Sequence, residues 1–382
     1  MRRRLFLLLC AVLTAVGPAL APAAPARGST NQVVRVGILL NQDTVALSAE
    51  GVIEVGDTAT QTVTPLPAGA YEFRPSPLGM DAGAHRFGAV VRLRSAAGWI
   101  QAGPRRYRGL IELRRSAMGR LTVINEIDLE EYLYGVIKME VDPRWPAEAL
   151  KAQAVAARTL AVQSVGRFAA EGYDLRATTD SQVYAGINAE DPRTTAAVEA
   201  TRGVIMTYAG RPIFAAYHSD SGGATESSEH VWGQPYPYLR GVVDPFGAGA
   251  PGREWLSRID LAGLEARLAR AGRPLAGILG IEVSSTSPSG RVLTVRVTGG
   301  GAAVELRGTE LRQILGVSLL RSTLFAVRLV GDNGAAAVEF RGRGSGHGVG
   351  MSQWGAWGQA AAGRGYAEIL RFYYQGIQLE TR

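Results

Sequence analysis

Glu140 is the first residue in this sequence whose position suggests chemistry. Four apolar residues precede it at helical spacing, and it continues their stripe: Leu129, Leu133, Val136 and Ile137. A carboxylate in such a stripe is poorly hydrated, which raises its pKa and suits a proton donor working near neutral pH. Alternatively, Glu140 marks a frayed helix end and lies in water, because the Asp142–Pro146 segment must stop the helix near Met139. The pattern leaves both interpretations open.

Two histidines stand in segments that also contain polar or glycine residues. His218 and Ser219 open the run His-Ser-Asp-Ser-Gly-Gly, but a Gly-x-Ser-x-Gly elbow is absent and a catalytic triad cannot be inferred from adjacency. His347 lies at the centre of five alternating glycines, Gly342 to Gly350, whose bare backbone a ligand can approach closely. The spacing is not that of a dinucleotide-binding fingerprint. A structural histidine in a tight turn is the alternative for His347.

Two predicted helices must position Glu140. Asp128, with Glu131 three residues later, forms a capping box that starts the first helix. The second helix is Ala-rich, begins at Pro146 and continues to Gln163. Its small side chains allow close approach by a neighbouring backbone or an extended ligand, although a core helix explains them equally well. On this second helix, Lys151 and Arg158 are seven residues apart and share a face.

The same segment resembles a known family. Tyr132-Leu-Tyr-Gly-Val, then Glu140, then Pro146-Ala-Glu-Ala-Leu-Lys-Ala-Gln-Ala-Val-Ala-Ala-Arg-Thr159, is similar to the signature of the SpoIID/LytB family. The similarity covers most of the mature chain. The family includes lytic transglycosylases that cleave peptidoglycan and proteins described as amidase enhancers. The resemblance implies that Glu140 is the catalytic acid/base and that no cofactor is needed.

The resemblance also implies a set of substrate contacts. The family has a Gln-Val-Tyr-x-Gly run, a His-Ser-x-Ser-Gly-Gly-x-Thr-Glu loop and a Gly-His-Gly-Val-Gly-Met-Ser-Gln loop beside its substrate groove, and all three occur here. The candidate substrate-binding residues are Lys151, Arg158, Gln182, Tyr184, His218, Ser219, His347 and Gln353. Tyr184 is alternatively an ordinary core residue. Some members bind zinc through a Cys pair before the Gln, but residues 175–181 lack cysteine and histidine, so no metal is predicted.

The implied substrate is the peptidoglycan glycan strand, stripped of stem peptides in the SpoIID type. Its free lactyl carboxylates suit a basic protein. Glu140 would give its proton to the glycosidic oxygen and then accept one from the muramyl C6 hydroxyl, leaving a 1,6-anhydro end. Asp142 and Glu148 keep a water-using muramidase open as an alternative. Two further functions stay open, namely a glycan-binding enhancer of an amidase partner and a structural wall-binding module.

The composition of the chain limits the kinds of partner that it can be expected to bind. The chain has 382 residues, is 46% hydrophobic and carries a formal net charge of +7, which favours an acidic partner. Its basic runs are short and scattered and lack the aromatic interleaving of nucleic-acid readers, so no nucleic acid is predicted.

Residues 1–27 read as an export signal, with Arg2-Arg3-Arg4 before a short apolar core. The predicted location is therefore extracytoplasmic, in the cell envelope. An uncleaved anchor stays open, and only then is membrane contact expected. Cys10, the single cysteine, lies inside this segment, so the mature chain is predicted to lack any thiol chemistry.

The predicted fold class is α+β, mostly antiparallel β with a central helical pair that carries Glu140. Short alternating runs separated by Gly, Pro and Asp indicate strands before the helices, and a helix is predicted over Trp255–Leu268. The expected organisation is a β-rich segment (33–120), a catalytic core (121–245), a β-rich side domain (246–335) and a C-terminal part of the core (336–382).

Overall fold

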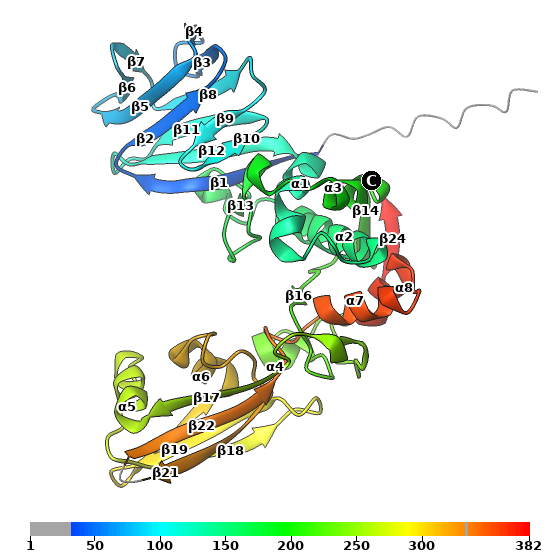
Figure 1. Cartoon of the computed structure of the whole chain (residues 1–382). Coiled ribbons are helices and arrows are strands. Elements are labelled where there is room, and N and C mark those ends of the chain that lie inside the picture. The colour runs from blue at the N-terminus through cyan, green and yellow to red at the C-terminus, as the bar shows by residue number, and fades with distance from the viewer. Residues whose placement is uncertain (1–31, 333–334) are drawn as a thin grey trace, which may run out of the picture. The chain divides into compact units, whose positions relative to one another are not determined.

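The computed structural model describes residues 32–332 and 335–382, and Figure 1 traces their order along the chain. The expected export segment, residues 1–27, lies outside the described residues. No helix in the described part of the chain combines the length and the apolar character needed to cross a membrane.

Two sheets form the N-terminal region. The seven-stranded sheet has the order β13-β1-β12-β11-β8-β3-β4, with β1 (Val33–Gln42), β3 (Ile53–Asp57), β4 (Val63–Leu66), β8 (Val90–Ser95), β11 (Leu110–Arg115), β12 (Leu121–Asp128) and β13 (Leu175–Arg176). The six-stranded sheet has the order β10-β9-β2-β5-β6-β7, with β2 (Val45–Ala49), β5 (Gly69–Ser76), β6 (Gly79–Ala82), β7 (His85–Phe87), β9 (Ile100–Ala102) and β10 (Arg105–Tyr107). All pairings in both sheets are antiparallel except that of β13 with β1. Alternate residues are buried, as in β3, and both sheets contribute to one hydrophobic cluster.

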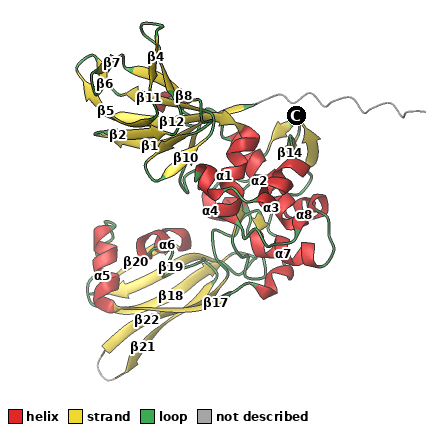
Figure 2. Cartoon of the chain, turned by 45° about the horizontal axis from the view of Figure 1, so that its top comes forward, coloured by secondary structure: helices red, strands yellow, loops and turns green. Residues whose placement is uncertain are grey.

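The Ala-rich segment forms α2 (Ala147–Gln163), and several of the helices drawn red in Figure 2 gather around it. They are α1 (Leu129–Glu140), α3 (Pro192–Ala200), α4 (Ser228–Trp232), α7 (Gln353–Ala361) and α8 (Tyr366–Tyr373). One side of α2 belongs to the N-terminal cluster, and its other side packs in a second cluster with α7 and α8. The alanines make this possible, because small side chains let neighbours approach a helix on two sides. The prediction of a buried, Ala-rich second helix is confirmed.

Short strands complete this region. β14 (Val204–Tyr208) pairs with β15 (Arg211–Pro212) and with β24 (Gln378–Thr381), and β16 (Tyr217–His218) pairs in parallel with β23 (Met351–Ser352). The β16–β23 pairing joins the two histidine-bearing loops, which are about 130 residues apart in sequence.

Residues 253–343, here called the inserted domain, pack around a third cluster of their own. Its strands are β17 (Glu254–Asp260), β18 (Ile278–Thr286), β19 (Val292–Gly299), β20 (Ala302–Arg307), β21 (Phe325–Asp332) and β22 (Ala335–Arg343), in two three-stranded sheets. Its helices are α5 (Leu261–Arg270) and α6 (Gly308–Leu315). The helix predicted over Trp255–Leu268 is wrong in its first half. Residues 254–260 alternate between exposed and half-buried along β17, and Asp260 caps a helix that begins only at Leu261.

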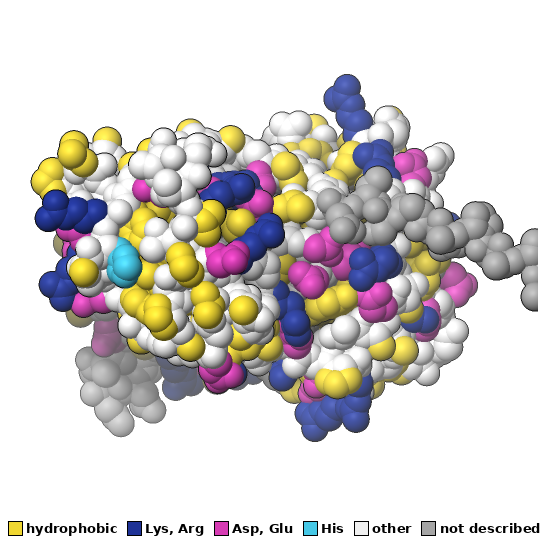
Figure 3. Space-filling view, turned by 90° about the horizontal axis from the view of Figure 1, so that it is seen from above, with side chains coloured by type: hydrophobic (Ala, Val, Ile, Leu, Met, Phe, Trp, Pro, Cys, Tyr) yellow, Lys and Arg dark blue, Asp and Glu magenta, His cyan; other side chains and the backbone are white. Residues whose placement is uncertain are grey.

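The fold class is α+β with mainly antiparallel sheets, as the sequence predicts. On the face drawn in Figure 3, acidic side chains lie between basic ones, so the net positive charge is not gathered in one patch there.

Candidate functional site

Glu140 is the last residue of α1 and lies at the carbonyl end of the helix. Asp128 caps the opposite end by accepting hydrogen bonds from the amides of Glu130 and Glu131. Burial raises the pKa of Glu140, while hydrogen bonding to Tyr217, the Val183 backbone and Gln353 opposes this rise. The negative end of the helix dipole also disfavours an ionised carboxylate there. Of the two interpretations made from sequence, the poorly solvated acid is the one the structure supports.

The groups that oppose the rise in the pKa of Glu140 are neutral. They can stabilise a carboxylate formed after proton donation, yet they do not neutralise its charge as an arginine would. Gln182 orients one of them, because its Nε2 donates to the Tyr217 hydroxyl at 3.1 Å. Its Oε1 accepts from the Tyr132 hydroxyl at 3.2 Å. Since the Tyr217 oxygen accepts from Gln182, its proton is available to Glu140.

The two histidines are held as neutral rings beside this network. The Val349 amide donates to His347 Nδ1 at 3.1 Å, so the proton of His347 is assigned to Nε2, which lies 3.0 Å from the Tyr217 carbonyl oxygen. His218 Nδ1 lies 3.1 Å from the Val349 carbonyl oxygen, and the two ring centroids are 5.5 Å apart. Burial lowers the pKa of His347 to about 4 and holds that of His218 well below its usual range. Neither ring is a cation at neutral pH.

Glu140 lines two cavities. One, of about 320 Å³, is lined by Glu140, Gln182, Tyr217, Trp232 and His347 among others. The other, of about 560 Å³, is lined by Glu140, Ser219, Gln353, Trp145 and Trp354 among others. A third, of about 430 Å³, shares Ser164, Arg167 and Phe214 with the first. Glu140 therefore stands at a junction of adjoining hollows with aromatic walls.

Most predicted site residues meet here. Gln182 and His347 line the first cavity, and Ser219 and Gln353 line the second. His218 is 4% exposed and reaches the site through its packing against His347. These placements put five of the candidate substrate contacts in or beside the hollows at Glu140.

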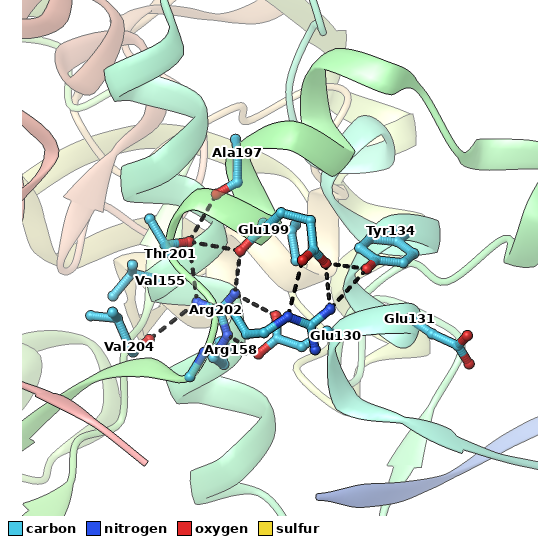
Figure 4. Close-up of polar contacts among 12 residues, drawn as sticks. Glu130, Glu131, Tyr134, Val155, Arg158, Ala197, Glu199, Thr201, Arg202 and Val204 are labelled. Carbon is cyan, nitrogen blue, oxygen red and sulfur yellow. Dashed lines mark hydrogen bonds and ion pairs between the residues drawn. The ribbon is translucent and has the colours of Figure 1, made fainter. Parts of the chain in front are cut away.

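Arg158 is not a surface residue, and its prediction as a substrate contact must be corrected. Its side chain is 0% exposed, and it forms a bidentate ion pair with Glu130, with distances of 2.8 and 2.6 Å (Figure 4). The same guanidinium donates to the carbonyls of Val198 and Val204, both at 3.1 Å. This network joins α1, α2 and α3, so Arg158 is a structural residue.

Tyr184 and Lys151 also lie outside the cavities. Tyr184 is 1% exposed, donates from its hydroxyl to Asn125 Oδ1 at 2.8 Å and packs against Tyr132. The alternative of an ordinary core residue is therefore correct for Tyr184. Lys151 pairs with Glu148 at 2.7 Å and is not among the residues that line the hollows at Glu140.

Sequence reasoning missed two contributors to the site. Tyr217 contacts Glu140, although in sequence it is only the end of an apolar hairpin that directly precedes His218. Trp354 packs against Trp145 in the second cavity, with the ring centroids 4.9 Å apart and the rings tilted by 57°, and it follows Gln353 directly. Each of the two adjoins a predicted site residue, and adjacency along a short strand or helix start is the signal that could have found them.

A further hollow of about 570 Å³ lies on the inserted domain and is lined by Trp255, Phe325, Arg341 and Arg343 among others. It shares no lining residue with the cavities at Glu140 and contains no histidine or tyrosine. Within residues 32–332 and 335–382, no group of three or more His, Cys, Asp or Glu side chains is placed to hold a metal ion.

Comparison with known proteins identifies two matching segments. Residues 117–208 match the family described as stage II sporulation protein, SpoIID. Residues 253–350 match a domain of unknown function, DUF8618. The first segment contains Glu140, Gln182 and both helices that position them, whereas the second contains the inserted domain and the His347 loop.

Similar whole proteins are also known. A stage II sporulation protein D of Bacillus subtilis is 33% identical over 272 residues, which are 67% of this chain and 75% of the relative. An uncharacterized protein of Brachyspira hyodysenteriae is 36% identical over 68% of each chain. An amidase enhancer of Bacillus subtilis is 31% identical over 65% of this chain and 40% of the relative.

Proposed function

This chain belongs to the SpoIID family of stage II sporulation proteins, and we propose that it cleaves peptidoglycan glycan strands as a lytic transglycosylase with Glu140 as acid/base. The observation that carries the proposal is the placement of Glu140. It is a poorly solvated carboxyl with only neutral partners, at the junction of two hollows. A polymer lying across that junction presents a bond to the acid with sugars on both sides.

The chemistry follows from the partners of Glu140. Its neutral carboxyl donates a proton to the glycosidic oxygen between N-acetylmuramic acid and N-acetylglucosamine as that bond breaks, and positive charge develops at the muramyl C1. The carboxylate so formed receives hydrogen bonds from Tyr217, the Val183 backbone and Gln353. It then takes the proton of the muramyl C6 hydroxyl, whose oxygen closes on C1. The enzyme is restored, and the strand ends in a 1,6-anhydro ring.

The walls of the hollows suit a sugar polymer. Trp232 lines the first cavity, and its ring centroid is 5.1 Å from that of His347 and 5.3 Å from that of Phe214. Trp145 and Trp354 line the second cavity. Aromatic faces and amide side chains such as Gln182 and Gln353 are the groups that bind sugar rings and their N-acetyl substituents. We propose that the substrate occupies both cavities at once, outside the cytoplasm in the cell envelope.

The test is digestion of amidase-treated peptidoglycan by the mature chain and by Glu140→Gln, with products read by mass spectrometry. Anhydro-ended products from the wild type alone are expected. Reducing ends would show instead that water attacks. Asp142 would then be the first candidate for the base that activates this water, because it lines the second cavity together with Glu140.

A second candidate function is a glycan-binding enhancer of an amidase, which the similarity to the Bacillus subtilis amidase enhancer favours. In that case the mature chain alone yields no products but binds glycan strands. It would then increase the rate of stem-peptide release by an added N-acetylmuramoyl-L-alanine amidase. Glu140→Gln would leave both effects unchanged, which separates this function from the transglycosylase.

A further inference from the structure

The turn between β18 and β19, residues Ser287–Arg291, buries itself in the loops that carry the two histidines. Ser287 is 5% exposed and Arg291 is 1% exposed, although both belong to a hairpin turn of the inserted domain. Turns normally lie in solvent because their backbone and polar groups need partners. This turn finds its hydrogen-bond partners in residues 221–226.

Arg291 holds the backbone of the His218 loop. Its Nη2 donates to the Ser221 carbonyl at 2.7 Å and to the Ala224 carbonyl at 3.4 Å. The glycine loop lies directly on the guanidinium, since a Cβ at Gly348 would be 2.5 Å from Arg291 Cζ. Gly348 also has a φ of +86°, so a side chain there is excluded by both contact and conformation. Arg291 thus packs between the loops that bear His218 and His347.

The serines of the turn hold a second point in the same loop. Ser289 donates to Glu226 Oε2 at 2.8 Å, and Ser287 donates to the same oxygen. The other oxygen, Oε1, accepts from the Ser227 amide at 2.8 Å and lies 2.8 Å from His230 Nδ1. Although burial opposes it, these hydrogen bonds lower the pKa of Glu226, which is therefore an anion at neutral pH. The Glu226 amide in turn donates to the Gly348 carbonyl at 2.8 Å.

The ends of the inserted domain are tied to these loops as well. The domain is entered at Arg253 and left at Gly344, and the Gly344 amide donates to the Arg253 carbonyl at 2.8 Å. Ser345 and Asp220 exchange two backbone hydrogen bonds. From Gly348 the connection to the acid is short: Val349 binds both histidines, His347 binds the Tyr217 carbonyl, and Tyr217 contacts Glu140.

We propose that the inserted domain is a positioning module of this site, in which Arg291 clamps the two histidine loops together and so places Tyr217 against Glu140. Arg291 is a positioning residue, because it does not line the hollows at Glu140. The catalytic part of the proposal rests on the proposed function, whereas the clamping part does not. It assigns a role to the segment that matches a domain of unknown function.

Arg291 has an electrostatic effect that makes the proposal measurable. Burial is the largest cause of the low pKa of His218 and of His347, and the positive charge of Arg291 lowers both pKa values further. The charge of Arg312 also lowers the pKa of His347. Glu226 and Asp220 are the carboxylates that act on Arg291, and they favour its charged form. Burial lowers the pKa of Arg291 to about 10, so it stays protonated at neutral pH. Without this charge and clamp, His347 should titrate at a higher pH.

The experiment is NMR of the imidazole ¹³Cε1 signals in the mature chain, followed from pH 8 to pH 4, for Arg291→Met and Arg291→Lys. The sequence has four histidines, and His347→Asn identifies the signal. Arg291→Met should shift the His347 signal and raise its apparent pKa, and Arg291→Lys should restore the charge effect in large part. The matched control is Arg258→Met, which changes an exposed arginine of the same domain that pairs with Glu339. An Arg291→Met titration identical to the wild type overturns the proposal.

Two additions keep the test decisive. If Arg291→Met does not fold, Ser289→Ala removes one hydrogen bond to Glu226 and should shift the same signal by a smaller amount. On glycan strands, Arg291→Met should lower kcat roughly 10- to 100-fold with little change in KM, since small misplacements at a catalytic centre have effects of this size. If the wild type cleaves nothing, the proposed function fails, but the NMR result still decides the clamp.

Discussion

One helix carries two poorly solvated glutamates with different kinds of partner. Glu130 lies in the first turn of α1 and its side chain is 7% exposed, in a bidentate pair with the fully buried Arg158. The Gly203 amide donates to it as well, at 3.0 Å. Glu140 lies at the other end, half-buried, and its partners are a tyrosine, an amide side chain and a backbone group.

The two glutamates differ in whether their partner carries a charge. A guanidinium satisfies the charge of Glu130 and makes it part of the scaffold between three helices. Neutral donors offset only part of the free-energy cost of ionising the buried Glu140, so its carboxyl keeps its proton to a higher pH than usual. The helix dipole adds to the contrast, because it favours a negative charge at the first turn and disfavours one at the last.

Glu140→Gln gives the largest expected effect. Loss of the proton donor should lower glycan cleavage by about 10²- to 10⁴-fold, the usual contribution of general acid/base catalysis. Initial rates on amidase-treated peptidoglycan measure it, and strand binding should be retained. Glu148→Gln is the matched control, since Glu148 pairs with Lys151 outside the hollows. Equal activity of Glu140→Gln and wild type would remove Glu140 from the mechanism.

Arg158→Met should have the next largest effect, and on stability. It leaves Glu130 buried without its cation, which typically costs about 3–5 kcal/mol. Denaturant unfolding of the purified protein measures the loss. The double variant Glu130→Gln/Arg158→Met should recover much of it, because no unpaired charge remains. A single Arg158→Met variant of unchanged stability would mean that the pair is not the scaffold described here.

Tyr217→Phe should move the pH dependence of cleavage. The Tyr217 hydroxyl favours the charged form of Glu140, so its removal should raise the pKa of Glu140 further. The limb on which activity falls as Glu140 loses its proton should then shift to higher pH. Rates from pH 4 to pH 9 measure the shift. The Tyr134→Phe control should not move that limb, because the Tyr134 hydroxyl binds Glu199 instead. A shift to lower pH with Tyr217→Phe would contradict the assignment.

The smallest expected effect is on the pH dependence of stability. Since the folded-state pKa of Glu140 is raised above its usual value of 4.5, its contribution is full below pH 4.5 and is lost as the pH rises through the folded pKa. Glu140→Gln removes that loss. The difference between the Tm of Glu140→Gln and the Tm of the wild type should therefore become more positive as the pH increases from 4 to 8. Calorimetry measures both values. A difference in Tm that is constant over this range would show that Glu140 is well solvated.

The local parts of the site were predictable from sequence. Asp128 begins α1 and the Asp142–Pro146 segment follows its end, so the position of Glu140 at a helix terminus depends on capping and on proline, which act within a few residues. Trp255–Asp260 shows the limit of such reasoning. Its apolar residues fit a helical pattern, but pairing with β22 about 80 residues later makes it a strand.

What the sequence alone determined is thus the α+β class, the helical pair and Glu140 at its junction. Only the tertiary structure decided which charges find partners. Arg158 binds Glu130, 28 residues away in sequence, and Arg291 binds the Ser221 carbonyl, 70 residues away. Neither contact can be predicted from the spacing of residues along the chain. The physical reason is that desolvation and pairing depend on what surrounds a group in space. The sequence pattern around an arginine on a helix is therefore the same whether the side chain binds a substrate or forms a buried ion pair in the core.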